Sequence, residues 1–127
     1  MATVELTKDN FEKVITESPI VIVDFWAPWC GPCRGFAPIY EQAAESHADV
    51  VFGKINTDQE QELAGAFNIR SIPTLMVFRE KVVLFQQAGA LPASALEQVI
   101  TQAKALDMAK VHQEIAERDR RDGQAPS

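Results

Sequence analysis

The feature that most constrains this chain is a pair of cysteines, three positions apart, close behind an apolar run. Cys30 and Cys33 are the only cysteines in 127 residues. Upstream, Ile20–Trp26 is almost continuously apolar, which predicts a central strand buried on both faces. Downstream, residues 34–47 predict a helix. A cysteine pair between a strand and the start of a helix is typical of a redox motif rather than of a structural crosslink.

The position of the pair suits thiol–disulfide exchange, which needs an attacking thiolate, a second thiol and a proton acceptor. A thiol at a helix N-terminus faces unpaired backbone N–H groups and the positive end of the helix dipole, so its thiolate is favoured. Cys30, expected to project outward, suits the attacking role, and Cys33, one turn further, suits the resolving role. Gly31 and Pro32 allow a tight turn into the helix, because proline is preset for early helical geometry.

The candidate proton acceptor is Asp24, which closes the apolar strand. At that place it should be buried, and burial raises the pKa of a carboxyl group. A carboxylate near Cys33 could take the proton of that thiol as it attacks. The alternative is a strand-end acid that faces water. Lys54, on the neighbouring predicted strand, could tune Asp24 by its charge, or it could be an ordinary surface lysine.

A zinc site is the alternative use of the cysteines. Cys30, Cys33 and His47 match the first part of a two-Cys, two-His spacing. No second histidine lies near His47, and His112 falls in a distant charged segment. We therefore expect no metal, and we interpret both histidines as solvated helix residues.

Composition narrows the class of protein further. The chain is 46% hydrophobic and 24% charged, which is ordinary for a globular domain and excludes wholesale disorder. The formal net charge of −6, without a basic stripe, makes nucleic acid an unexpected partner. Asp24 interrupts the longest apolar run, so we expect no membrane span. Residues 1–5 lack the features of a signal peptide, and the cysteines cannot link distant elements, so we expect a cytoplasmic protein.

The remaining elements follow from periodicity and turn signals. Residues 9–12 have capping-box spacing before a helix that Ser18 and Pro19 end, and Pro38 should kink the helix after the cysteines. Further strands are predicted at Thr3–Leu6, Val50–Asn56, Leu75–Phe78 and Val82–Phe85, and further helices at Glu60–Phe67 and Ala93–Leu106. The order β-α-β-α-β-α-β-β-α predicts an α/β fold in which helices sandwich a mixed sheet.

Taken together, these residues resemble the thioredoxin family over roughly residues 3–106. The Trp-Cys-Gly-Pro-Cys string is highly specific, and a separately placed Ile-Pro-Thr makes coincidence improbable. The residues that carry the resemblance are Val23–Cys33, Pro38, Lys54–Asp58, Ile72–Thr74 and Gly89–Ala90. The resemblance implies the thioredoxin fold for a domain at 1–106, followed by a charged, helical or disordered extension at 107–127.

The resemblance also implies a role for each matching residue. Cys30 would be the nucleophile, Cys33 the resolving thiol and Asp24 the buried acid–base partner. Pro73 would follow a cis peptide bond, and the backbone of Ile72 would pair with an extended substrate segment. The apolar contact face would comprise Trp29, Gly31, Pro32, Ile72, Pro73, Gly89 and Ala90.

The function so implied is the reduction of disulfides in client proteins, with no cofactor bound to this chain. A flavin- and NADPH-dependent thioredoxin reductase would regenerate the dithiol, and a monomer is expected. Gly31 and Pro32 resemble reducing members of the family, whereas oxidases and isomerases usually carry histidine there. Two alternatives remain: a disulfide isomerase or oxidant, and a non-catalytic binding or chaperone-like subunit that uses the apolar face.

The chain departs from the family pattern in three places. Arg34 stands where lysine is usual, which keeps the charge. The predicted hairpin turn at Arg79–Lys81 lacks the usual glycine. The chain also continues for about twenty residues, in which Met108, Val111 and Ile115 are spaced as a thin apolar helical stripe. This stripe could continue the last helix and dock on a partner or a second copy, or it could be a solvated helix that ends in a disordered tail at 123–127.

Overall fold

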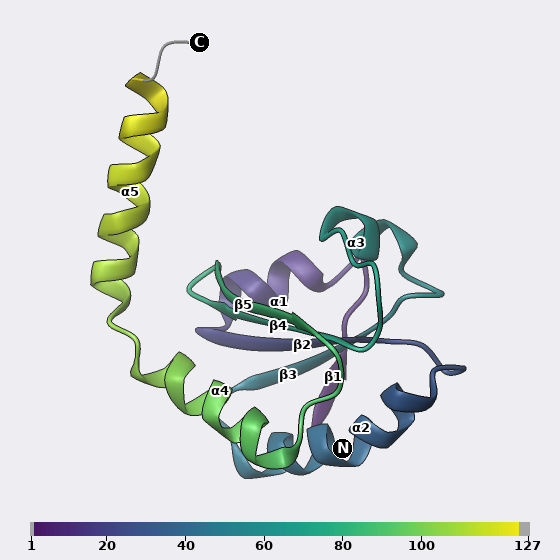
Figure 1. Ribbon diagram of the computed structural model, residues 1–127. Coiled ribbons are helices and arrows are strands. Elements are labelled where there is room, and N and C mark those ends of the chain that lie inside the picture. The colour runs from purple at the N-terminus through teal and green to yellow at the C-terminus, as the bar shows by residue number, and fades with distance from the viewer. Residues whose placement is uncertain (1, 125–127) are drawn as a thin grey trace.

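The apolar run after Pro19 forms the central strand of the sheet. The computed structural model, which describes residues 2–124, shows the predicted alternation of strands and helices, with one helix added at the end (Figure 1). The strands are β1 Thr3–Glu5, β2 Ile20–Trp26, β3 Val51–Asn56, β4 Thr74–Arg79 and β5 Val82–Ala88. The helices are α1 Phe11–Glu17, α2 Gly31–Ser46, α3 Gln61–Ala66, α4 Ala93–Ala105 and α5 Met108–Gln124.

The sheet is mixed, with strand order β1-β3-β2-β4-β5. β2 pairs in parallel with β3 and antiparallel with β4, so it has a neighbour on each side. Its first six residues are buried. This confirms the predicted central strand and the predicted fold class. Because β2 and β3 are parallel, their carboxyl ends meet at the same edge of the sheet, where the chain turns into α2.

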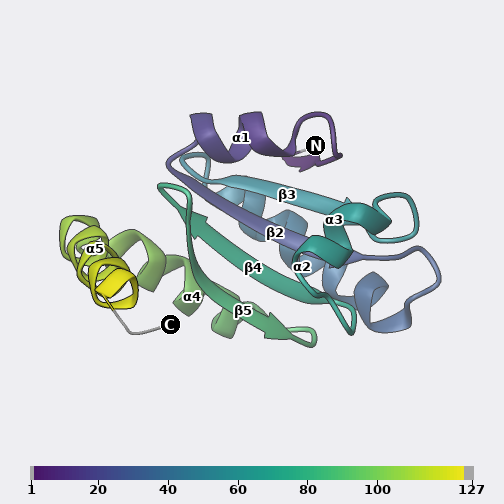
Figure 2. The same cartoon turned by 90° about the horizontal axis from the view of Figure 1, so that it is seen from above.

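Helices cover both faces of the sheet (Figure 2). On one face, α2 and α4 pack over a core that includes Ile22, Phe36, Tyr40 and Ile100. On the other face, α1 and α3 cover a second core built on the alternate residues of β2, such as Val23. Successive strand residues point to opposite faces, so Ile22 and Asp24 share the face that α2 covers.

The start of α1 differs from the predicted capping box. Asn10 is the N-cap residue, and its side chain makes no capping hydrogen bond to the helix. Its Oδ1 instead accepts the backbone N–H of Thr7, and its Nδ2 donates to the carbonyl of Glu5. The predicted capping box, with Asp9 as its first residue, was wrong because the N-cap is Asn10, whose side chain closes the turn that leads out of β1.

The β4–β5 turn shows how the chain manages without the usual glycine. Glu80 and Lys81 have φ values of 50° and 70°, so both lie in the left-handed region. Two successive positive φ values are typical of the tight hairpin turns whose twist matches that of the strands. The backbone N–H of Glu80 donates to the carbonyl of Pro19, which ties the turn to the start of β2.

The extension forms a separate helix rather than a continuation of α4. Leu106 has extended geometry, and Arg79 Nη1 lies 2.8 to 3.1 Å from the carbonyl oxygens of Ala103, Lys104 and Leu106, which closes the end of α4. Asp107 Oδ1 then accepts the N–H of Lys110 at the start of α5. The alternative in which the extension continues the last helix is therefore wrong.

The first turns of α5 contact the domain itself. Met108 is 6% exposed, and His112 Nε2 lies 3.0 Å from Glu80 Oε1 in the β4–β5 turn. The rest of α5 extends away from the sheet (Figure 1). Of the predicted disordered tail, residues 123 and 124 are the last of α5, which contradicts the prediction there, and residues 125–127 lie outside the described part. Between residues 2 and 124, no helix has the length and apolar character to cross a membrane.

Candidate functional site

The cysteine pair lies where β2 turns into α2. Cys30 is the N-cap residue of α2, and its Sγ accepts the backbone N–H of Cys33 at 3.2 Å. Gly31 and Pro32 are the exposed first two residues of the helix. Cys30 and Cys33 form a disulfide. The helix start therefore offers the Cys30 sulfur a hydrogen-bond donor, and such a donor stabilises a thiolate more than a thiol.

The exposure of Cys30 differs from the prediction. Cys30 is 4% exposed and Cys33 is 3% exposed, so neither projects into solvent. In the disulfide, the Cys30 sulfur turns toward Cys33 and packs with Ala27, Trp26 and Ile72. The carbonyl oxygen of Ile72 lies 3.7 Å from Cys30 Sγ. Trp29, which directly precedes Cys30, is 66% exposed.

Asp24 is buried on the face of β2 that α2 covers, and its burial was predicted from its place in the strand. It is 1% exposed, and its Oδ1 has no hydrogen-bond partner among residues 2–124. Burial raises the pKa of this carboxyl group from 3.8 to about 7, against the opposing effect of the positive charge of Lys54. A carboxyl group with a pKa near neutrality can both accept and return a proton at physiological pH.

Lys54 is the β3 residue that pairs with Asp24 across the parallel ladder. Its Nζ lies 4.7 Å from the centre of the Trp26 ring, a distance typical of a cation–π contact. Lys54 is half-buried rather than fully exposed. Its positive charge lowers the pKa of Asp24, against the larger effect of burial.

The Ile72–Pro73 segment reaches the cysteines from the loop before β4. The Ile72–Pro73 peptide bond is cis, as the resemblance implied. Ile72 packs against the cysteine pair, and the carbonyl of Pro73 accepts the N–H of Gly89 at 2.8 Å. Gly89 has a φ of 101°, which favours glycine, and Ala90 beside it is exposed. Tertiary contact thus brings residues 72–73 to the cysteines and ties Gly89 to them.

One contact of Trp29 was not anticipated from the sequence. Its indole Nε1 donates to the Asp58 carboxylate, 3.1 and 3.0 Å from the two oxygens. Asp58 is in turn positioned by Asn56, whose Oδ1 accepts the N–H of Asp58 at 2.9 Å. The signal was available: Asp58 follows β3 and Trp29 follows β2, and the ends of parallel neighbours meet at one edge of a sheet.

The histidines lie away from the cysteines. His47 follows the last residue of α2, and a 16-residue helix is about 24 Å long, so His47 cannot share a zinc ion with the cysteines at the other end. Its Nε2 lies 2.8 Å from Glu97 Oε2 and its Nδ1 lies 2.9 Å from Lys104 Nζ. The interpretation of His47 as solvated was wrong, because these partners from α4 cover it. His112 is exposed but paired with Glu80.

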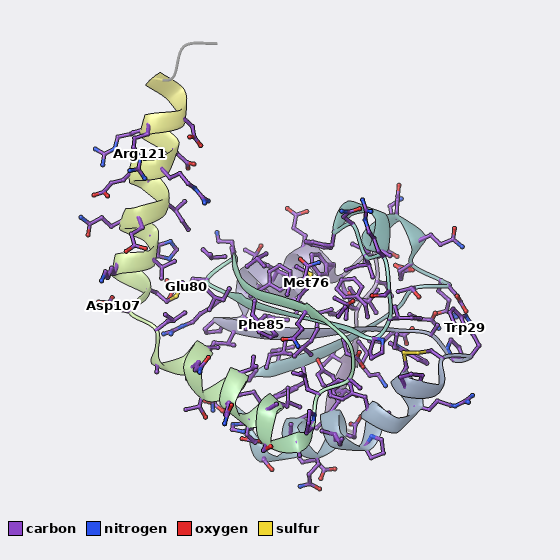
Figure 3. The ribbon with its side chains drawn as sticks, viewed as in Figure 1. Trp29, Met76, Glu80, Phe85, Asp107 and Arg121 are labelled. Atoms are coloured by element: carbon purple, nitrogen blue, oxygen red, sulfur yellow. A yellow bond between two sulfur atoms is a disulfide. The ribbon has the colours of Figure 1, made fainter. Side chains whose placement is uncertain are left out.

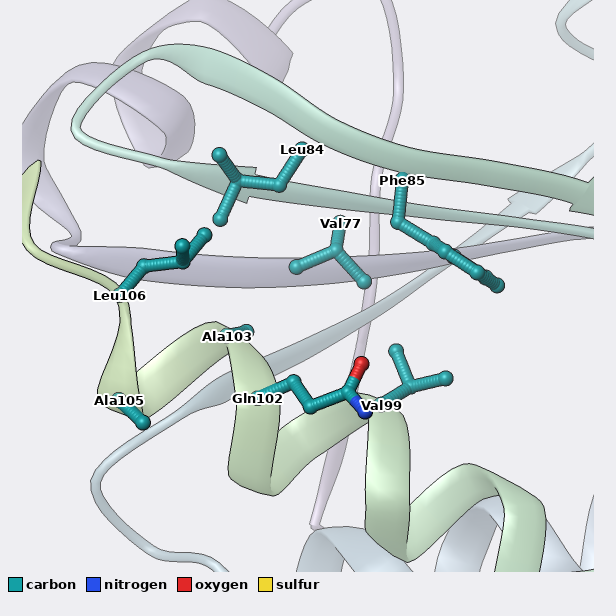
Figure 4. A pocket seen from close by; sticks show the side chains of 8 residues that line it. All are labelled: Val77, Leu84, Phe85, Val99, Gln102, Ala103, Ala105 and Leu106. Atoms are coloured by element: carbon teal, nitrogen blue, oxygen red, sulfur yellow. The ribbon is translucent and has the colours of Figure 1, made fainter. Parts of the chain in front are cut away.

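An apolar groove of about 360 Å³ lies between the hairpin strands and α4, not at the cysteines (Figure 4). Its lining comprises Val77, Leu84, Phe85, Val99, Gln102, Ala103, Ala105 and Leu106. The surroundings of the cysteine pair are instead formed by the partly buried side chains of Trp26 and Ile72 and by the exposed side chain of Trp29. Figure 3 shows Trp29 at one end of the molecule and α5 at the other. The arrangement at the cysteines suits an extended chain better than a small ligand.

Comparisons with known proteins agree with this geometry. The sequence model of the thioredoxin family matches residues 2–102. A putative thioredoxin 2 of Streptomyces coelicolor is 54% identical over 122 residues, covering 96% of this chain and 91% of the relative. A thioredoxin of Alicyclobacillus acidocaldarius is 46% identical over 97 residues, and the match covers 76% of this chain and 92% of the relative. Among solved structures, a Plasmodium falciparum thioredoxin matches with a TM-score of 0.72 and 36% sequence identity. The match covers 77% of this chain and 96% of the Plasmodium chain.

Proposed function

Because the chain belongs to the thioredoxin family and is a thiol–disulfide oxidoreductase built on Cys30 and Cys33, we propose a role for each residue of its site. Cys30 is the nucleophile, Cys33 the resolving thiol, Asp24 the proton acceptor, and Lys54 the charge that tunes Asp24. The observation that carries the proposal is the place of Cys30 Sγ at the N-cap of α2, where it accepts the N–H of Cys33. This donor remains available to Cys30 as a thiolate.

The reaction proceeds through one mixed disulfide. The Cys30 thiolate attacks a client disulfide, so a Cys30–client S–S bond forms and the first client sulfur leaves as a thiolate. Cys33 gives its proton to the Asp24 carboxylate and attacks Cys30 Sγ. The bond between Cys30 and the client then breaks, and the second client sulfur leaves. The client disulfide gains two electrons, and the Cys30–Cys33 pair loses them.

We propose that clients bind at a client face that surrounds the disulfide. It comprises Trp29, Gly31, Pro32, Ile72, Pro73, Gly89 and Ala90. The backbone of Ile72 is the pairing edge for an extended client segment, a mode in which main-chain hydrogen bonds provide the affinity. The 3.7 Å approach of the Ile72 carbonyl to Cys30 Sγ supports this, because a segment paired there lies against the reacting sulfur.

The partners and the compartment follow from the need to regenerate the dithiol. Each turnover leaves Cys30 and Cys33 oxidised, so a reductant must act on the same face. We propose a thioredoxin reductase that carries electrons from NADPH through a flavin, as the family implies, with clients that contain disulfides. We propose the cytoplasm as the site of action, because a reducing compartment favours the dithiol form. We also propose that the protein acts as a monomer.

The test is NADPH-coupled reduction of insulin disulfides in the presence of a thioredoxin reductase. The wild-type protein should support continuous NADPH oxidation, and the Cys30→Ser, Cys33→Ser double variant should support none above the protein-free rate. If the double variant still complemented a strain that lacks the protein, a binding role of the client face would replace catalysis. A potential as oxidising as those of the periplasmic oxidases would favour an oxidant or isomerase.

We further propose that residues 1–106 are the redox domain and that residues 107–127 are an extension anchored to it. Truncation after Leu106 should lower the free energy of unfolding by about 2 kcal/mol, because the burial of Met108 is lost, and the exposed pair of His112 and Glu80 adds little. The insulin reduction rate should not change, since α5 and Trp29 lie at opposite ends of the molecule (Figure 3).

Thermal and urea unfolding check this prediction. The matched control is full-length Met108→Ala, which should reproduce most of the loss because it removes the buried side chain and keeps the helix. An unchanged melting temperature in the truncated protein would show that the extension is a loose tail. If truncation instead changed the number of chains in the particle, measured as the mass in solution divided by the mass of the chain, the extension would mediate self-association.

A further inference from the structure

Tyr40 carries a buried hydroxyl group that takes no part in the proposed thiol–disulfide exchange. Its side chain is 0% exposed and comes from α2, two turns after Cys33. Its hydroxyl oxygen lies 2.7 Å from the carbonyl oxygen of Gly53 and 3.0 Å from that of Ile22. One phenol proton can thus be donated to either of two neighbouring strands, which links α2 to β2 and β3 at a single point.

The two carbonyl groups that the Tyr40 hydroxyl contacts lie close to Asp24 and Lys54 in the sheet. Asp24 is two residues beyond Ile22 on the same face of β2, and Lys54 directly follows Gly53 on β3. Asp24 and Lys54 are themselves paired in the ladder. The Tyr40 hydroxyl therefore holds the sheet immediately beside the carboxylate and its neighbouring charge.

Both ends of the link are rigid. On the α2 side, the Tyr40 ring packs against Phe36 and Phe52, with ring centres 5.7 and 5.4 Å away. On the sheet side, Leu6 lies so close to Gly53 from the opposite face that a Cβ there would collide with it. The Gly53 backbone is thus held between Leu6 and the Tyr40 hydroxyl. A contact between two rigid partners transmits position, because packed interiors do not yield to small displacements.

Cys33, Phe36 and Tyr40 lie on the face of α2 that turns toward the sheet, and all three are buried. About 10 Å of helix separates Cys33 from Tyr40, and about 7 Å of strand separates Ile22 from Asp24. A Tyr40 hydroxyl held at the carbonyls of Ile22 and Gly53 therefore limits how far α2, and Cys33 with it, can shift along β2 relative to Asp24. Proton transfer depends steeply on such placement, because a displacement of about 1 Å can cost a hundredfold in rate.

We propose that Tyr40 is a positioning residue for the resolving step: its hydroxyl sets α2 on the sheet so that the Cys33 thiol meets the Asp24 carboxylate. The inference rests on the proposed role of Asp24 as proton acceptor. Tyr40 itself transfers no proton, since burial, followed by the charges of Asp24 and Glu41, raises its pKa well above the usual value. The ionisable groups coupled to Asp24 are Lys54 from β3 and Tyr40 from α2.

The experiment separates the two steps of the reaction with an aromatic disulfide reagent, dithionitrobenzoate, in stopped flow. Attack by Cys30 releases one coloured thiolate at a rate that depends on reagent concentration. Attack by Cys33 releases the second at a rate that does not. Tyr40→Phe removes only the hydroxyl group. We expect the second step to slow by about threefold to tenfold and the first step to stay within a factor of two.

The dependence of the second-step rate on pH is a second readout. A purely structural role of Tyr40 would leave this dependence unchanged. The rate of the second step should rise with ionisation of Asp24, and Tyr40→Phe should reduce the amplitude of that rise. Ile100→Val is the matched control, because it lowers stability from the same core but lies on α4. It should change neither step, nor the profile. An equal slowing in Ile100→Val would overturn the inference.

A double-mutant cycle with Asp24→Asn distinguishes the inference from the function on which it rests. If Tyr40 acts through Asp24, Tyr40→Phe should have no further effect on the second step in the Asp24→Asn background. An equal effect in both backgrounds would overturn the role of Tyr40 and leave that of Asp24 intact. A second step that Asp24→Asn leaves unchanged would instead contradict the proposed role of Asp24 itself.

Discussion

Replacing Asp24 by asparagine should raise the free energy of unfolding by about 4 kcal/mol at pH 9 and leave it nearly unchanged at pH 3. The reason is the cost of a buried negative charge. The pKa of Asp24 is about 7 in the folded protein, against 3.8 for the ordinary group, because burial outweighs the charge of Lys54. Each pH unit between these values costs the folded state about 1.4 kcal/mol.

The direction of the pH dependence follows from where the proton is held more tightly. The folded state binds it more tightly than the unfolded chain, so the contribution of Asp24 to stability is fully present below pH 3.8. It is lost as the pH rises to about 7 and stays lost above that value. Asparagine carries no charge at any of these pH values, so the variant does not incur the penalty.

Urea unfolding of both proteins in the oxidised form, at pH values from 3 to 9, checks this prediction. Asp119→Asn, on an exposed part of α5, is the matched control and should show no such dependence. If the difference between Asp24→Asn and wild type were constant across the range, the carboxyl group would not be held neutral by burial. The same variant should slow the resolving step, so stability and activity are expected to move in opposite directions.

Single replacements of the two cysteines should have opposite consequences for client binding. Cys30→Ser should lower the rate of insulin reduction by a factor on the order of a thousand or more, as in other enzymes that lose their nucleophile. Cys33→Ser should still attack client disulfides but should not release them, because no second thiol can displace the client. Covalent complexes through Cys30 should therefore accumulate.

Non-reducing electrophoresis of Cys33→Ser after exposure to a cell extract checks this result, with mass spectrometry to locate the crosslink. The complexes should disappear on reduction and should be absent from the Cys30→Ser, Cys33→Ser double variant. Crosslinks formed by Cys30→Ser as readily as by Cys33→Ser would contradict the assigned roles. The same experiment identifies the clients. The side chains of the client face do not by themselves indicate which proteins bind there.

Several parts of this site were accessible from local sequence patterns. The run Ile20–Trp26 predicted a buried strand, and its burial placed Asp24 in an apolar setting with a raised pKa. The spacing of Cys30 and Cys33 placed one thiol at the helix start and the other one turn inside. These predictions succeeded because each depends on neighbours within one strand or one helical turn, where backbone geometry determines which side chains meet.

Contacts between distant segments were beyond such patterns. The cover of His47 by Glu97 and Lys104 and the closure of α4 by Arg79 join elements far apart in the chain. The cis bond before Pro73 was expected only from the family resemblance, since most X–Pro bonds are trans. The burial of Cys30 was missed because it depends on the packing of Ala27, Trp26 and Ile72 around the cysteine pair.

By itself, the sequence determined the alternation of strands and helices, the redox pair and its buried acid, because these follow from residue spacing along one element. The tertiary structure alone decided which side chains face the reacting sulfur, where α4 ends and α5 begins, and that the Tyr40 hydroxyl lies between two strands beside Asp24. These features depend on how far elements approach one another in the packed core, and that distance is a property of the whole fold.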